Sequence, residues 1–178
     1  MAEYSLNTEN LKTEAEKLHA GDRALLSGVV YTSRDAAHKR IFELLDGEKE
    51  LPYSLDGACV YYCGPTPTPK GLPIGSCGPT TSGRMDPYTP RLLDLGLSAM
   101  IGKGVRSKEV NDAIVRNKAV YFCAVGGAGA LAAQCVDSCE VIGFDDLGCE
   151  SVKRIVLRDF PVVVATDCHG ETLFNQEL

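Results

Sequence analysis

Residues 77–87 read Cys-Gly-Pro-Thr-Thr-Ser-Gly-Arg-Met-Asp-Pro, and the rest of the chain can be placed around this stretch. It has no apolar run, but it carries three hydroxyl side chains, an arginine and an aspartate. Gly78 and Gly83 let the backbone bend and approach a ligand closely. Free backbone N–H groups in such a loop can bind an anion, and Arg84 offers a two-pronged donor for a carboxylate or phosphate. We interpret the stretch as an anion-binding loop, and a plain surface turn is the alternative.

Short apolar segments alternate with helical patterns along the whole chain. We expect strands at about 4–9, 23–31, 58–63, 98–105, 119–125, 139–142, 152–157 and 160–165, and helices at about 34–45, 87–95, 108–117 and 129–134. Asp86 can cap a helix that begins at Pro87. Gly28, inside an apolar strand, indicates a bulge or a close approach of another segment. This mixture predicts an α/β fold in a single domain over residues 1–178, with a loose tail at 168–178.

Charge and composition exclude several classes of protein. The 178 residues carry a net charge of −6, which argues against non-specific binding to nucleic acid or to an anionic membrane. The first residues lack the basic start and apolar segment of a signal peptide. The longest uncharged apolar stretch, 119–133, is too short to cross a bilayer. We therefore expect a soluble, cytoplasmic protein with no membrane and no nucleic-acid partner.

Eight cysteines require an explanation. Cytosolic proteins rarely hold disulfides, and no Cys-x-x-Cys pair occurs. The spacing of Cys135, Cys139 and Cys149 matches no iron–sulfur or zinc pattern well. We expect no metal held by this chain; a cysteine-based redox or metal protein is the alternative, and it predicts bound iron or zinc in the isolated chain.

Two further basic residues stand at the ends of predicted strands. Arg34 falls in the first turn of a predicted helix, where the helix dipole disfavours a cation. An arginine beside free N–H groups at a helix start is suited to a carboxylate, although a surface pair with Glu43 or another acid is the alternative. Gly102-Lys103-Gly104 exposes its lysine at the end of a strand, and it is not part of a Walker A loop.

Five segments in order resemble the β-subunit, or C-terminal domain, of the iron–sulfur hydro-lyases, which are the class I fumarases and L-tartrate dehydratases. The segments are 34–40, 78–86, 102–104, 125–130 and 147–152, and residues 159–161 continue the match. The resemblance covers about residues 20–170. It implies a swivelling β/β/α-type domain, with mixed sheet layers flanked by helices.

The resemblance also implies an activity. Class I fumarases hydrate fumarate reversibly to L-malate, and tartrate dehydratases convert L(+)-tartrate to oxaloacetate and water. A [4Fe-4S] cluster acts as the Lewis acid, and in two-chain members the α-subunit carries its cysteines. The chain is then the β-subunit of a class I fumarate hydratase, inactive without its α-subunit. A tartrate dehydratase β-subunit, a non-catalytic carboxylate-binding module and a homodimer of β chains stay open.

The same resemblance implies roles for individual residues. Arg34 and Arg84 resemble clamps on the substrate carboxylates, Thr80 resembles the proposed base, and Lys103 resembles a further contact. A threonine hydroxyl is a weak base on its own and needs a partner acid. We also expect Thr81 and Gly78 to bind substrate, and Asp35, His38 and Asp86 to support or cap the contact residues.

Overall fold

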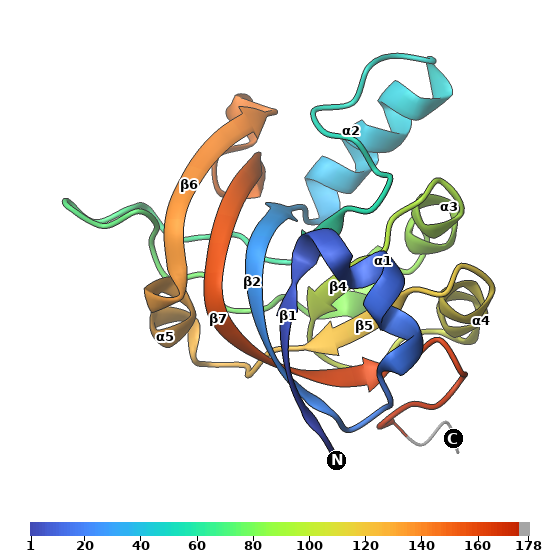
Figure 1. Cartoon of the computed structure of the whole chain (residues 1–178). Helices are drawn as coiled ribbons and strands as arrows, with labels where there is room; N and C mark the ends of the chain where they lie inside the picture. The colour runs from blue at the N-terminus through green and yellow to red at the C-terminus, as the bar shows by residue number, and fades with distance from the viewer. Residues whose placement is uncertain (175–178) are drawn as a thin grey trace.

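The computed structural model describes residues 1–174, which form one seven-stranded sheet with helices around it (Figure 1). The strand order is β1-β2-β3-β4-β5-β7-β6, and β2 also pairs with β7. The strands β2, β3, β4, β5 and β7 therefore form a closed ring. The strands are β1 (Glu3–Asn7), β2 (Arg23–Thr32), β3 (Cys59–Tyr61), β4 (Ala99–Gly102), β5 (Val120–Cys123), β6 (Val136–Gly143) and β7 (Val152–Thr166).

Strand direction divides the sheet into two parts. Each neighbouring pair from β1 to β5 is parallel, whereas β7 runs antiparallel to β2, β5 and β6. With 15 residues, β7 is long enough to pair with all three. It closes the ring because its first part lies beside β2 and its last part beside β5.

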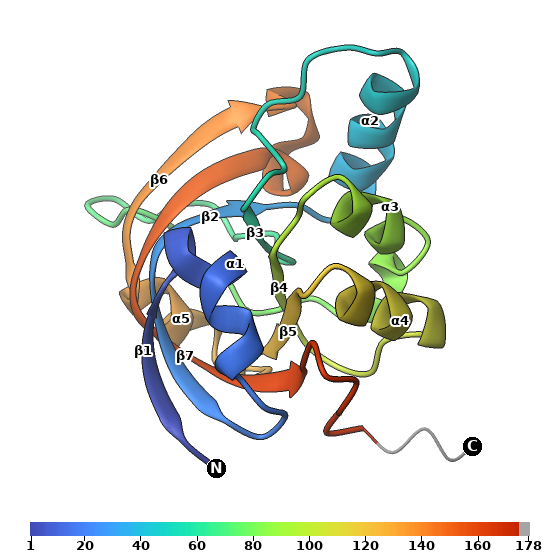
Figure 2. The same ribbon diagram turned by 45° about the vertical axis from the view of Figure 1, so that its right-hand side comes forward.

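The helices gather mainly on one side of the ring. Figures 1 and 2 show α2, α3 and α4 beside one another, while β6 and the first part of β7 curve away on the other side. The α-helices are α1 (Leu11–Glu14), α2 (Asp35–Asp46), α3 (Thr89–Asp94), α4 (Lys108–Arg116) and α5 (Gly129–Gln134). The 3-10 helices are η1 (Thr8–Asn10), η2 (Ala15–Lys17), η3 (Ser82–Met85) and η4 (Asp145–Glu150).

Two apolar cores form because successive residues of a strand point to opposite faces. In β5, Phe122 belongs to the core enclosed by the ring, whereas Tyr121 belongs to the core under the helices. In β4, Ile101 and Met100 divide in the same way. Strands that are buried on both faces read as continuous apolar runs, which explains why their sequence pattern shows no alternation.

The predicted α/β class is confirmed, and several local predictions can be compared with the structure. The strand expected at 139–142 begins at Val136, and the two expected at 152–157 and 160–165 are the single strand β7. The predicted bulge is confirmed: the register of β2 shifts between Leu26 and Gly28. Gly28 has φ +113, and a Cβ there would collide with the Thr8 hydroxyl, so glycine is required.

The helix expected from Pro87 begins two residues later, at Thr89, so the prediction that Asp86 caps it was wrong. Near the C-terminus, Cys168 is buried and Thr166 forms a bridge with Thr172. Residues 175–178 of the tail predicted to be loose lie outside the described residues. Within residues 1–174, no helix combines the length and apolar character that a membrane crossing needs.

Candidate functional site

The candidate site lies where the parallel strands end. Because β2, β3, β4 and β5 are parallel, their carboxyl ends meet at one edge of the sheet, which is the usual place for a ligand in such folds. Arg34 follows β2 and Lys103 follows β4. The loop 77–86 contacts both segments: Nε of Arg84 donates to Oδ1 of Asp35, the neighbour of Arg34 (2.9 Å), and the Ser82 N–H donates to the Lys103 carbonyl (2.9 Å). The structure thus brings together three segments that the sequence singled out.

A single aspartate joins the two predicted arginine clamps. Arg84 donates to Asp35 through Nε (2.9 Å to Oδ1) and through Nη2 to Oδ2. Nη2 of Arg34 lies 3.7 Å from the same Oδ2 and 3.2 Å from Oε1 of Glu150. The Arg84 side chain is 47% exposed and that of Arg34 is 22% exposed. Both side chains therefore keep some exposed surface, and the alternative that Arg34 pairs with an acid is met by Glu150 and Asp35, not by Glu43.

Asp35 stays ionised in this arrangement. Burial raises the pKa of its carboxyl, but the hydrogen bonds and the positive charge of Arg84 outweigh burial and hold the pKa below its ordinary value. The carboxylate is therefore a fixed negative charge at neutral pH. It orients Arg84 and is not a source of protons.

The loop between the clamps presents hydroxyl groups. Thr80 is half-buried and Thr81 is exposed. Among residues 1–174 the Thr80 hydroxyl has no hydrogen-bond partner, while Thr81 is held by an isolated bridge to Lys103. Gly78 packs against the start of α5, where a Cβ would lie 3.4 Å from Cα of Gly129. Packing alone is therefore a sufficient reason for this glycine, and its contact with substrate stays a prediction.

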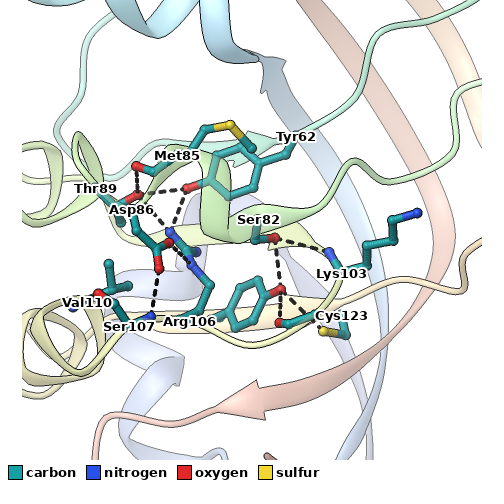
Figure 3. Close-up of polar contacts among 12 residues, drawn as sticks. Tyr62, Ser82, Met85, Asp86, Thr89, Lys103, Arg106, Ser107, Val110 and Cys123 are labelled. Atoms are coloured by element: carbon teal, nitrogen blue, oxygen red, sulfur yellow. Dashed lines mark hydrogen bonds and ion pairs between the residues drawn. The ribbon is translucent and has the colours of Figure 1, made fainter.

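Lys103, the third basic residue singled out by the sequence, follows β4. Its ammonium group is 4.0 Å from the position that a Cβ on Gly126 would take, and it makes no ion pair within the described part of the chain. In Figure 3 the side chain extends away from the buried network behind it. The structure does not join Lys103 to Arg34 or Arg84 by any side-chain contact.

Asp86 fixes the end of the loop 77–86 to the residues before α4. Its Oδ1 accepts from Nε of Arg106 (2.7 Å), and its Oδ2 accepts from the N–H of Ser107, the N-cap of α4 (2.6 Å). The buried guanidinium of Arg106 lies over the rings of Tyr121 and Tyr62, with distances of 4.9 and 5.3 Å to their centroids (Figure 3). Sequence analysis missed Arg106, because nothing in its neighbours distinguishes it from an ordinary residue before a helix.

Ser82 is a second supporting residue that sequence analysis missed. Its buried Oγ accepts from the Lys103 N–H (3.1 Å) and lies 2.9 Å from the hydroxyl of Tyr121, which donates to the Gly104 carbonyl (2.8 Å) (Figure 3). A Cβ on Gly102 would collide with this Oγ. Ser82 therefore fixes the loop that carries Thr80 and Arg84 against the end of β4.

His38 is buried in α2 behind the arginines. Its Nδ1 lies 2.9 Å from the Arg34 carbonyl and 2.9 Å from the Ser33 hydroxyl, and its ring packs against Tyr62 and Tyr88. Burial lowers the pKa of His38 to about 4, so the ring is neutral at pH 7. Its position suits support of the turn before α2, because only 1% of the residue is exposed.

The described residues do not gather a cluster site. The one group of three potential metal ligands within residues 1–174 is His19, Asp167 and Glu171, and it contains no cysteine. Burial raises the pKa of Cys77 to about 12 and keeps this thiol protonated. Three thiolates for an iron–sulfur cluster are not brought together in the described part of the chain.

A cavity of about 370 Å³ lies between α5, the end of β5 and β7. Its walls are mainly apolar and include Val125, Leu131 and Phe160, with no charged side chain. Of the loop 77–86 it touches Pro79 alone. An apolar cavity cannot orient a dianion, so the candidate site is the edge that carries Arg34 and Arg84.

Comparison with known proteins gives consistent matches. Residues 1–177 match the family described as Fumarase C-terminus. The chain is 40% identical over 156 residues to "Fumarate hydratase class I, anaerobic" of Escherichia coli, covering 86% of this chain and 28% of that protein. It is 39% identical over 165 residues to "Fumarate hydratase 1, mitochondrial" of Leishmania major, covering 92% of this chain and 30% of that protein.

A shorter relative is matched over almost its full length. The chain is 35% identical over 180 residues to "Putative L(+)-tartrate dehydratase subunit beta" of Methanocaldococcus jannaschii, covering 98% of this chain and 92% of that protein. By contrast, the chain spans less than a third of the two fumarate hydratases.

Proposed function

The chain belongs to the Fumarase C-terminus family, and from this premise we propose that it is the β-subunit of a class I fumarate hydratase. With a separate α-subunit it would hydrate fumarate reversibly to L-malate. Two findings support the proposal: the match to the Fumarase C-terminus family together with the similarity to fumarate hydratases, and coverage of 92% of a protein named as a tartrate dehydratase subunit beta. The ring of strands with helices on one side would be the swivelling β/β/α domain of this enzyme type.

The observation that carries the proposal is the pair of arginines at one edge of the sheet. A dicarboxylate needs a cation for each carboxylate, and a guanidinium binds a carboxylate with two parallel hydrogen bonds. Arg34 and Arg84 lie on either side of Asp35, and both keep exposed surface. Holding a dianion in one orientation can lower the barrier by several kcal/mol. We assign the two arginines as the carboxylate clamp.

Thr80 and Lys103 complete the proposed site. The Thr80 hydroxyl stands on the loop that ends in Arg84, which suits a group that moves a proton at a carbon next to a carboxylate. Its intrinsic basicity is low, so an acid or base from the partner chain is needed. Lys103 adds a positive charge that would favour the enolate-like charge of the transition state.

The [4Fe-4S] cluster of this enzyme type would be carried by the α-subunit. The described residues offer no set of thiolates for it, so we expect the site to be shared with the partner chain. A cytoplasmic location and a homodimer of β chains stay predictions.

An L(+)-tartrate dehydratase β-subunit is the second candidate, favoured by the match over almost the whole length of the archaeal relative. A non-catalytic carboxylate-binding module is the third candidate. It needs one or two of the three basic residues, whereas the lyase needs Arg34, Arg84 and Lys103 together with Thr80.

The test is activity of the reconstituted enzyme. The chain is co-expressed anaerobically with the product of the adjacent gene as the candidate α-subunit, and fumarate is followed by its ultraviolet absorbance, with L(+)-tartrate assayed in parallel. Fumarate turnover by the complex and not by either chain alone is expected. If the complex turns over tartrate but not fumarate, the chain is a tartrate dehydratase β-subunit. If a complex with an intact cluster turns over neither compound, the chain is a non-catalytic carboxylate-binding module.

A further inference from the structure

The segment 147–152 has no role in the site described so far, yet it contacts the site directly. Oε1 of Glu150 lies 3.2 Å from Nη2 of Arg34. Oε2 of Glu150 accepts from the N–H of Ala36 (2.9 Å), in the first turn of α2. One carboxylate thus contacts both the clamp residue and the helix start beside it. Arg34 is the N-cap of α2 and makes no capping hydrogen bond itself, so Glu150 supplies the cap from a distant part of the chain.

Each arginine of the clamp has its own carboxylate. Arg84 uses both oxygens of Asp35, while Arg34 lies closer to Glu150 (3.2 Å) than to Asp35 (3.7 Å). Gly64 supplies the surface on which Arg34 rests, because a Cβ there would lie 2.6 Å from Nη1 of Arg34. Without Glu150, the nearest remaining acid for Arg34 is Asp35, and the two guanidinium groups would compete for it.

A buried lysine holds the turn that carries Glu150. Nζ of Lys153 donates to the Gly148 carbonyl (3.1 Å), the Ser151 hydroxyl (2.7 Å) and the Ser151 carbonyl (3.3 Å). The backbone is tied as well: the Lys153 N–H donates to the Thr32 hydroxyl (3.0 Å), which donates to the Ser151 carbonyl (3.2 Å). Thr32 is the last residue of β2, two positions before Arg34. The turn and the clamp residue are therefore fixed to the same strand end.

We propose that Glu150 is a positioning residue of the carboxylate clamp, which sets the guanidinium of Arg34 for one carboxylate of a dianionic substrate, and that Lys153 anchors the turn bearing Glu150. This inference rests on the proposed function. Glu150 contacts Arg34 and acts through it. Its removal weakens binding of the substrate carboxylate in the ground state and the transition state alike, so KM rises more than kcat falls.

The experiment compares Glu150→Gln, Glu150→Asp and the control Glu140→Gln. The carboxylate of Glu150 contacts Arg34 with one oxygen and the Ala36 N–H with the other. Glutamine has only one acceptor oxygen and cannot make both contacts in this way, whereas aspartate keeps two. Glu140 is exposed on β6 and makes no ion pair within the described residues, so the same chemical change there leaves the site intact. In the complex with the α-subunit, Glu150→Gln should lower kcat/KM at least tenfold, mainly through KM. Glu150→Asp should recover part of the loss.

A merely structural role would lower the unfolding midpoint of Glu150→Gln and leave its KM unchanged, and this result would overturn the inference. A second readout does not need turnover: the isotope-labelled full chain is titrated with succinate, an unreactive dicarboxylate, and the Ala36 amide is followed by NMR. At least tenfold weaker binding by Glu150→Gln than by the wild type is expected. If Glu150→Gln and the wild type bind succinate equally well, or if the wild type does not bind it, the inference is overturned. If Glu150→Gln binds succinate more weakly but the wild-type complex shows no turnover, only the proposed function is overturned.

Discussion

Replacing Asp86 by asparagine tests the buried ion pair between Asp86, at the end of the loop 77–86, and Arg106. The Arg106 side chain is 0% exposed and that of Asp86 is 13% exposed. Among residues 1–174, Asp86 is the one acid that pairs with Arg106, and Nη1 of Arg106 has no partner. Asp86→Asn keeps the shape and one acceptor oxygen, but it leaves the guanidinium charge buried and uncompensated.

Removing one partner of a buried pair costs about 3–5 kcal/mol, because the other charge stays out of water. The rings of Tyr62 and Tyr121 and the retained acceptor keep part of the stabilisation. We therefore expect a loss at the low end of this range, about 3 kcal/mol in the free energy of unfolding. For a chain of this length this corresponds to a Tm lower by roughly 6–12 °C.

Urea unfolding followed by circular dichroism measures the change, and Asp94→Asn is the matched control. Asp94 pairs with Arg116 on the surface, where both side chains are about half exposed, so that exchange should barely move the midpoint. If the urea midpoint of Asp86→Asn shifts no more than that of Asp94→Asn, the argument that Asp86 stabilises the buried charge of Arg106 is refuted.

The remaining predictions concern the clamp, the proposed base and the buried histidine. Arg84→Lys keeps the charge but loses the two-pronged contact, so kcat/KM of the complex should fall at least tenfold; an unchanged value would remove Arg84 from the site. Thr80→Ser should retain most activity and Thr80→Ala should lose it, whereas equal activity of the two variants would show that Thr80 is no base. Because burial lowers the pKa of His38 from 6.5 to about 4, the unfolded chain binds the extra proton between these values, and stability is lost as pH falls through this window. Urea unfolding should give about 2 kcal/mol less stability at pH 5 than at pH 7 from this residue, and His38→Gln should remove that part of the difference; an unchanged difference in the variant would contradict the assignment.

The fold class could be read from the sequence because strands and helices carry local patterns. Apolar segments around Val60, Ile101 and Phe122 are buried on both faces, and such runs are typical of central strands. Closure of the ring could not be predicted, since it depends on β7 pairing with β2, more than a hundred residues away. The sequence predicted two strands where the structure has the single strand β7, because a proline such as Pro161 usually indicates the end of a strand.

Arg34 and Arg84, which we propose as the clamp, were singled out in the sequence because they stand in loops that carry other recognisable residues. Asp35, His38 and Asp86 were expected to support the site, whereas Arg106 and Glu150 were not singled out, for a physical reason. Arg106 acquires its role by packing against Asp86, and Glu150 acquires its role by meeting the start of α2, 114 residues earlier at Ala36. Such contacts are properties of the folded chain and leave no local pattern.

The most direct measurement of the central claim is fumarate hydration by the complex with the double variant Arg34→Lys/Arg84→Lys, beside the wild type and beside Glu140→Gln. We expect turnover by the wild-type complex and by Glu140→Gln, and a loss of at least a hundredfold in kcat/KM in the double variant, whose charge is unchanged. Full activity of the double variant would contradict the claim that these two guanidinium groups clamp the dicarboxylate at the carboxyl edge of the sheet.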